Sequence, residues 1–225
     1  MQDNKNFLAK EPIGKLLLKL SIPTVIAQLI NMLYNVVDRI YIGHIPGEGS
    51  LALTGVGVCM PIIMIVTAFA ALISSGGAPR ASICMGKQDN KSAEQILGNC
   101  FSLQIVVSIV LTVVLLIWNK DLLMAFGASK NTLGYATDYM RIYALGTLFV
   151  QLTLGMNAFI TAQGFTTTSM VSVLIGAICN ITLDPVFIFV FNMGVKGAAL
   201  ATVIAQTLAS AYCLWKLCRI EVLAE

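Results

Sequence analysis

Charged side chains are scarce in this 225-residue sequence: they make up 11% of it, against about 25% in an average soluble domain. Hydrophobic residues account for 57%, and the mean hydropathy is +0.84. This balance excludes an ordinary water-soluble domain and indicates that lipid surrounds most of the chain. The net charge of +3 is small and basic residues do not alternate with aromatic ones, so nucleic acid is not an expected partner.

The residue patterns of metal centres and disulfide frameworks are also missing. Histidine occurs once, and the six cysteines form neither a CxxC motif nor a Cys/His pair. We therefore expect free thiols and no transition-metal site. No cleavable signal pattern is expected at the start, because the first apolar segment is too long and no small-x-small motif follows it. The cysteines are Cys59, Cys84, Cys100, Cys179, Cys213 and Cys218.

Six apolar segments each approach the roughly 20 residues that span a bilayer as a helix. They are residues 22–43, 51–76, 96–118, 139–163, 168–191 and 195–217. The predicted fold is an all-α membrane protein with six transmembrane helices. Residues 1–21 alternate apolar and lysine positions and predict a cytoplasmic amphipathic segment, with the first spanning helix starting at Ser21–Pro23. A short surface helix is expected within 118–138.

Lysine and arginine positions predict the orientation of this chain in the membrane. With the N-terminus inside, nine basic residues fall on the cytoplasmic side and five on the outer side. Cytoplasmic loops carry the excess of Lys and Arg, so we expect an integral, multi-pass plasma membrane protein with both ends in the cytoplasm. Trp118, Tyr135, Tyr139 and Tyr143 are interpreted as an interfacial aromatic belt.

Two acids occupy positions inside spanning segments, where a carboxylate costs about 3 kcal/mol or more. Asp38 lies in the first segment, at the end of a polar stripe that shares one helix face: Thr24, Gln28, Asn31, Asn35 and Asp38. Such stripes in lipid normally face a bundle interior or an aqueous cavity. We therefore expect Asp38 to be functional.

The fifth segment repeats the pattern. Asn180 and Asp184 are four residues apart on one face, and Pro185 leaves the Ile181 carbonyl without its usual donor. Broken helices with freed carbonyls beside carboxylates coordinate ions in many transporters. Thr202 in the sixth segment falls at a similar depth, and Asn157 in the fourth lies nearer the midplane. For Asn157 and Thr202 taken alone, helix packing is the favoured explanation. Gly55, Gly57, Gly76 and Gly77 are expected to let helices approach closely.

These motifs resemble the N-terminal lobe of multidrug and toxic compound extrusion (MATE) transporters, and the acids most resemble the DinF-like and archaeal-type branch. The matching stretches cover nearly the whole chain in order. They are residues 33–43 (LYNVVDRIYIG), 126–128 (FGA), Asn157 with Gln163–Gly164, 180–185 (NITLDP) and 194–202 (GVKGAALAT).

The resemblance implies a cation-coupled multidrug antiporter rather than an enzyme. It implies an ion site of Asp38, Asn180, Asp184 and Thr202, with Asn157 nearby, for Na⁺ or H⁺ and no other cofactor. The candidates for a substrate cavity are Gln28, Asn31, Tyr34, Asn35 and Gln206. Expected partners are the bilayer, small organic and often cationic compounds, and a C-terminal six-helix lobe or a second chain.

The family's transporters have twelve helices, so residues 22–217 correspond to one lobe and residues 218–225 to the start of an inter-lobe linker or a shortened C-terminus. A lipid-linked saccharide flippase of the same superfamily is one alternative, although the stripes contain no Lys or Arg. An intramembrane aspartyl protease is another, although Tyr-Asp and Gly-x-Gly-Asp are replaced here by Val37-Asp38 and Leu183-Asp184. A lobe without transport of its own is the third.

Overall fold

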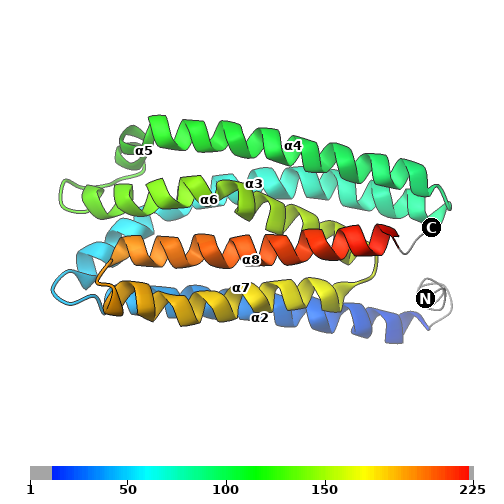
Figure 1. Ribbon diagram of the computed structural model, residues 1–225, viewed down its shortest axis with the longest axis horizontal. Helices are drawn as coiled ribbons and strands as arrows, with labels where there is room; N and C mark the ends of the chain where they lie inside the picture. The colour runs from blue at the N-terminus through cyan, green and yellow to red at the C-terminus, as the bar shows by residue number, and fades with distance from the viewer. Residues whose placement is uncertain (1–11, 223–225) are drawn as a thin grey trace.

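The computed structural model describes residues 12–222, and this part of the chain is almost entirely helical (Figure 1). Six of its helices are long and apolar enough to cross a membrane, which confirms the predicted fold class. In chain order the elements are α2 (Ile13–Gly43), α3 (Gly49–Gly86), α4 (Asn90–Ile117), α5 (Asn119–Ala125), α6 (Leu133–Ala162), α7 (Thr166–Pro185), the π-helical turn η1 (Val186–Val190) and α8 (Val195–Val222).

Helix α6 lies at the centre of the helix bundle. It packs against α3 and α4 on one side and against α8 on the other, and α8 in turn packs against α7. Helix α2 contacts mainly α7, along which it runs in Figure 1. Of the six spanning helices α6 is the most enclosed and α2 the least. The two helices that carry the membrane acids, α2 and α7, are therefore direct neighbours.

Two helix boundaries differ from the prediction. Helix α2 begins at Ile13 and continues through Pro23, so the expected helix start at Ser21–Pro23 is wrong. Residues 13–21 belong to the first spanning helix, and residues 1–11 of the predicted amphipathic segment lie outside the described residues. Helix α3 continues to Gly86 through two prolines. Both helices continue past their prolines, each of which costs one backbone hydrogen bond.

The predicted short helix after the third span is confirmed as α5, and glycines end both α5 and α6. Gly127 and Gly164 have positive φ angles of 98° and 86°, which a residue without a Cβ adopts easily. The next residues fold back on the helix: the Ala128 N–H donates to the Leu123 carbonyl at 2.9 Å and the Phe165 N–H to the Ile160 carbonyl at 3.2 Å. These turns explain the FGA and Gln163–Gly164 motifs.

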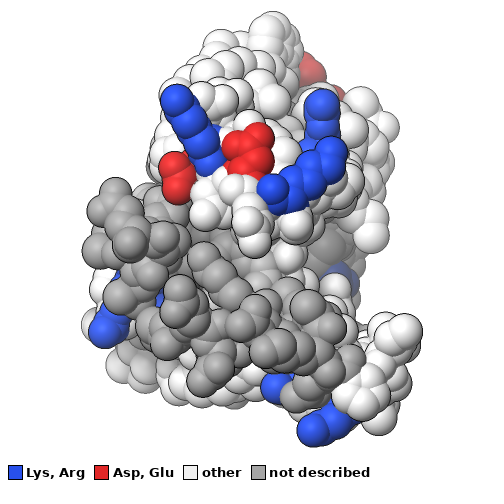
Figure 2. Space-filling model, turned by 90° about the vertical axis from the view of Figure 1, so that its right-hand side faces the viewer, with Lys and Arg blue, Asp and Glu red and all other residues white. Residues whose placement is uncertain are grey.

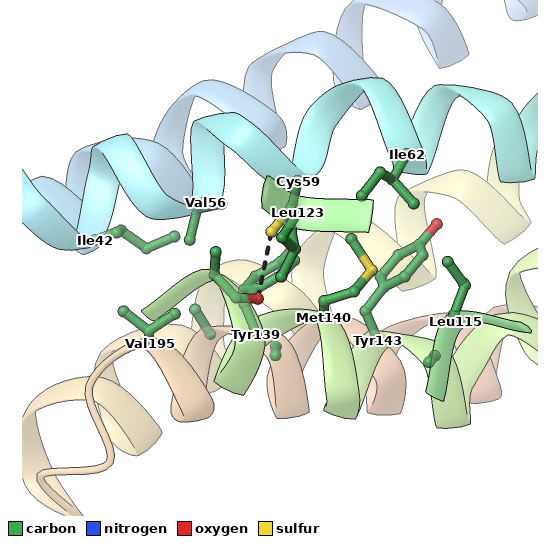
Figure 3. Close-up of a cluster of buried hydrophobic side chains, with 14 of the residues drawn as sticks. Ile42, Val56, Cys59, Ile62, Leu115, Leu123, Tyr139, Met140, Tyr143 and Val195 are labelled. Atoms are coloured by element: carbon green, nitrogen blue, oxygen red, sulfur yellow. Dashed lines mark hydrogen bonds between the residues drawn. The ribbon is translucent and has the colours of Figure 1, made fainter. Parts of the chain in front are cut away.

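A cluster of apolar side chains closes the end of the lobe opposite the termini (Figure 3). Tyr139 and Tyr143 lie inside it, 4% and 3% exposed, so their assignment to an interfacial belt is wrong. Their helix is the central one, which leaves no lipid-facing position for them, whereas Trp118 is half exposed as a belt residue should be. Cys59 donates to the Ala136 carbonyl at 3.5 Å in this cluster, and all six cysteines are free, as predicted.

Candidate ion-binding site

The side chains of Asp38 on α2 and Asp184 on α7 lie next to each other. Asp38 is 8% exposed and Asp184 0%. Asp38 stands slightly more than one helical turn before the end of α2 at Gly43. Because α2 and α7 run side by side, their acids meet at the same depth, and the pair forms the centre of the candidate site.

Asn180 and Thr202 complete the group around Asp184. The Asn180 amide Nδ2 donates to Asp184 Oδ1 at 3.2 Å and to the Thr202 hydroxyl at 3.4 Å. Asn180 stands one turn before Asp184 on α7, and Thr202 comes from α8. The structure therefore brings together the four residues that the sequence motifs implied, from three helices.

Several oxygens of this group have no hydrogen-bond donor. Asp38 Oδ1, Asp184 Oδ2 and Asn180 Oδ1 are enclosed and unpartnered within the described residues. Carboxylate, amide and hydroxyl oxygens are the ligands of hard cations, and two adjacent carboxyls can also share a proton. The donor set therefore fits Na⁺ or H⁺. Residues 12–222 contain no group of three or more His, Cys, Asp or Glu side chains that could hold a metal ion.

Pro185 sets the local backbone of the site. Proline has no N–H, so the regular α-helical bonding of α7 ends there and the chain passes into η1. In this turn the Phe191 N–H donates to the Val186 carbonyl, five residues back, at 2.9 Å. The prediction of a broken helix beside Asp184 is confirmed, and short π-helical turns of this kind are frequent at functional sites.

Three tyrosines border the acids, and sequence reasoning assigned only Tyr34, as a cavity residue. Tyr139 on α6 lies beside Thr202, and it is close enough to Asp38 for the two groups to interact electrostatically. Tyr34 on α2 lies close to both acids and to Tyr143. Tyr139 and Tyr143 are four residues apart and therefore share one face of a long apolar segment. This spacing could have indicated that α6 presents two hydroxyl groups to the interior of the protein.

Asn157 does not belong to this group. Its Oδ1 accepts from Ser172 on α7 at 2.7 Å and from Cys213 on α8 at 3.4 Å. Ser172 stands three helical turns before Asp184, about 18 Å along α7. The expectation that Asn157 lies near the ion site is wrong, because α6 continues well past the acids before it presents Asn157.

The cavity candidates are in two different places. Along α2, Gln28 is exposed while Asn31, Tyr34 and Asn35 are half-buried, so the polar stripe becomes more open with distance from Asp38. Gln206 on α8 is half-buried; its backbone carbonyl accepts from Thr153 of α6 at 3.1 Å, and its side-chain Oε1 is enclosed. Gln206 thus belongs to the contact between α6 and α8 rather than to the polar stripe of α2.

Comparisons with known proteins agree with this geometry. The family model MatE matches residues 23–186. The multidrug export protein MepA of Staphylococcus haemolyticus is 29% identical over 213 residues, which cover 94% of this chain and 47% of the relative. The chain thus spans about half the length of the curated relatives it matches.

Solved structures match equally well. A chain named protein A is 38% identical, with a TM-score of 0.84 over 90% of this chain and 45% of its own. A MOP superfamily transporter from Pyrococcus furiosus, described by a reverse polarity of its binding pocket, is 26% identical, with a TM-score of 0.86 over 94% of this chain and 46% of its own. The resemblance seen in the motifs is confirmed: the chain is a multi-pass membrane protein that belongs to the MATE family, a family of transporters rather than enzymes.

Proposed function

We propose that this chain is the N-terminal lobe of a cation-coupled multidrug efflux antiporter, and that Asp38 and Asp184 bind the coupling ion, Na⁺ or H⁺. The observation that carries the proposal is the enclosed group of Asp38, Asp184, Asn180 and Thr202, with its unpartnered oxygens. The family membership and the name of the multidrug export relative support efflux of small organic compounds. The acid motifs favour the DinF-like and archaeal-type branch.

The geometry suggests how an ion couples to movement. Two carboxylates at short range in a poorly solvated site repel each other, and a bound Na⁺ or a shared proton removes that repulsion. Helix α2 packs mainly on α7, so the interaction between Asp38 and Asp184 lies in its main contact with the lobe. Binding of the ion therefore stabilises the docked position of α2, and its release lets α2 move.

The proposal includes a second half. The polar stripe of α2 is open at Gln28, and the relatives are about twice as long as this chain, which supports a C-terminal lobe or a second chain across the cavity. We also propose that the N-terminus is cytoplasmic. Figure 2 shows basic side chains, with some acidic ones among them, at the end of the molecule where α2 begins and α8 ends. Lys87 and Lys91 flank the α3–α4 turn, and Lys216 lies in the last turns of α8.

Ion binding is tested on the purified 225-residue chain. Na⁺ or acid should raise its thermal unfolding midpoint, because a ligand that binds only the folded state stabilises it. Asp38→Asn and Asp184→Asn should each abolish this ion-dependent rise. Asp121→Asn, at an exposed position on α5, is the matched control and should keep it. If Na⁺ or acid still raised the unfolding midpoint of both Asp38→Asn and Asp184→Asn, the carboxyl pair would be ruled out as the ion site.

Efflux is tested with the lobe alone and with a partner. In cells stripped of other drug pumps, the chain alone should insert without conferring resistance, and co-expression with a matching C-terminal lobe should restore resistance. Asp38→Asn or Asp184→Asn should abolish the restored resistance while membrane levels stay unchanged. Ion-dependent resistance from the chain alone would instead establish a homodimeric transporter.

A further inference from the structure

Polar side chains continue from the carboxyl pair through the interior of the lobe, between α6, α7 and α8. On α7, Ser172, Asn180 and Asp184 share one face with Gly176, which lies against Ala205 and Ala209 of α8. Polar residues of α6 and α8 contact one another or this face on both sides of that small-residue level. We call the part beyond the ion site the polar seam; it consists of Thr153, Asn157, Ser172, Gln206 and Cys213.

Hydrogen bonds join the three helices at successive levels of the seam. Nearest the ion site, Thr153 of α6 donates to the Gln206 carbonyl of α8 at 3.1 Å. Farther along, Asn157 of α6 accepts from Ser172 of α7 and from Cys213 of α8. Together with the Asn180–Thr202 bond, polar contacts therefore occur at three levels.

The seam leads toward one end of the lobe. From Asp184 to Ser172 the distance is about 18 Å along α7, more than half of a hydrocarbon core about 30 Å thick. The direction is from the acids toward the α6–α7 turn, the end at which the termini lie in Figure 1. The acids lie close to the opposite end. The seam therefore extends along the longer of the two distances between the acids and the ends of the lobe.

The seam is uncharged, mostly buried and incompletely paired; Asn157 and Gln206 are half-buried. Ser172 and Cys213 are 0% exposed and Asn180 is 1% exposed. At the two positions next to the acids, the acceptors Gln206 Oε1 and Asn180 Oδ1 are enclosed without a protein donor. Buried acceptors are nearly always paired with protein or ordered water. These two acceptors could bind a water molecule or an ion that moves to or from the carboxyl pair.

From these observations we propose that the polar seam is the water-accessible path by which the coupling ion passes between the carboxyl pair and the α6–α7 end of the lobe, with Gln206 as the relay next to the ion site. This inference rests on the proposed function of the carboxyl pair. The opposing explanation is that the seam only fastens the three helices by hydrogen bonds, as polar residues often do in membranes.

Hydrogen–deuterium exchange at the acids separates the two explanations. Infrared spectra of the chain in lipid nanodiscs at acid pH should show carboxyl bands that Asp38→Asn or Asp184→Asn removes, and transfer to D₂O should shift them. Gln206→Leu should slow this shift at least about tenfold, because it removes the relay acceptor from the path. Gln104→Leu is the control, since Gln104 is a buried amide in the α4–α6 contact, away from the seam, and it should leave the rate unchanged.

Each result is decisive. Equal exchange rates in Gln206→Leu and Gln104→Leu, with the carboxyl bands present, would overturn the path and leave the ion site standing. The absence of carboxyl bands that depend on Asp38 or Asp184 would overturn the proposed function and the path together.

Cys213 offers a second measurement. In chains that keep a single cysteine, the others being alanine, a small charged thiosulfonate should label Cys213 at least about tenfold faster than Cys59, if water reaches the seam. Both thiols are 0% exposed and each lies in an apolar cluster, but Cys213 also donates to the Asn157 side chain of the seam, whereas Cys59 donates to backbone carbonyls. In sealed liposomes the labelling should occur from the side of the α6–α7 turn. Equal and slow labelling of the two thiols would overturn the path.

Discussion

The side-chain amide of Gln104, on α4, fills the space that a methyl group on Gly155, on α6, would occupy. Both residues are buried, so neither helix can shift without disturbing the packing around the central helix. Gly155→Ala should therefore destabilise the lobe by about 1–3 kcal/mol, as overpacked cores do. The measurement is thermal unfolding in detergent. Gly98→Ala, where an added methyl group meets open space, is the control, and Gln104→Ala should rescue Gly155→Ala.

The glycines of α3 give a second test of helix packing. A Cβ on Gly55 would lie 2.9 Å from Tyr135 Cβ and 3.0 Å from the Thr132 carbonyl, whereas a Cβ on Gly57 meets nothing within 4 Å. We expect Gly55→Ala to cost about 1–3 kcal/mol of stability, because backbone cannot yield as a side chain does. Gly57→Ala should be neutral or stabilising by up to about 1 kcal/mol. Equal unfolding midpoints for the two variants would contradict this packing.

The hydroxyl of Thr202 should contribute modestly to ion binding. It accepts from Asn180 and holds that amide beside Asp184, so Thr202→Val leaves the amide with one partner fewer. One neutral hydrogen bond contributes about 0.5–1.5 kcal/mol, so ion affinity should fall roughly threefold to tenfold. Ion titration of thermal stability measures this. Thr182→Val, an exposed threonine of α7 that bonds only within its own helix, should change nothing.

Asp89 should make stability depend on pH at the start of α4. Its side chain accepts from the Ser92 N–H at 3.1 Å, and the hydrogen bonds from Ser92 lower the pKa of this carboxyl. A lowered folded-state pKa stabilises the protein above the unfolded value of about 3.9, and the effect disappears as the pH falls through the folded value. Asp89→Ala should therefore lower the unfolding midpoint at pH 7, with a difference that shrinks as the pH falls through the folded-state pKa. Asp89→Asn, which keeps a neutral capping oxygen, should keep most of the stability but lose the pH dependence.

The sequence predicted the spans and the four central site residues for a simple physical reason. Lipid excludes charge, so each acid inside an apolar segment stood out, and helical spacing placed Asn180 beside Asp184. The Pro185 break was also readable, since it follows from the missing N–H of proline. The ion itself and the position of residues 1–11 stay predictions.

The predictions from sequence were wrong for residues whose environment depends on which helices are neighbours. Tyr139 and Tyr143 look like belt residues until α6 is known to be central, and Asn157 seems close to the acids until its depth on α6 is compared with that of Ser172 on α7. Pro23 looked like a helix start because proline favours the first turn, but apolar residues on both sides continue the helix through it. Tertiary packing decides all these cases, and no local pattern encodes it.

The carboxyl pair lies closer to one end of the helices than to the other, and this has an electrical consequence. Asp38 lies about 8 Å from the end of α2, roughly a quarter of the hydrocarbon thickness. Moving one elementary charge through the whole membrane potential involves about 2.3 kcal/mol per 100 mV. An ion bound at the pair from the near side has crossed only the smaller part of that field. In our proposal the larger part falls along the polar seam, so the membrane voltage acts mainly on the passage between Asp184 and the α6–α7 turn.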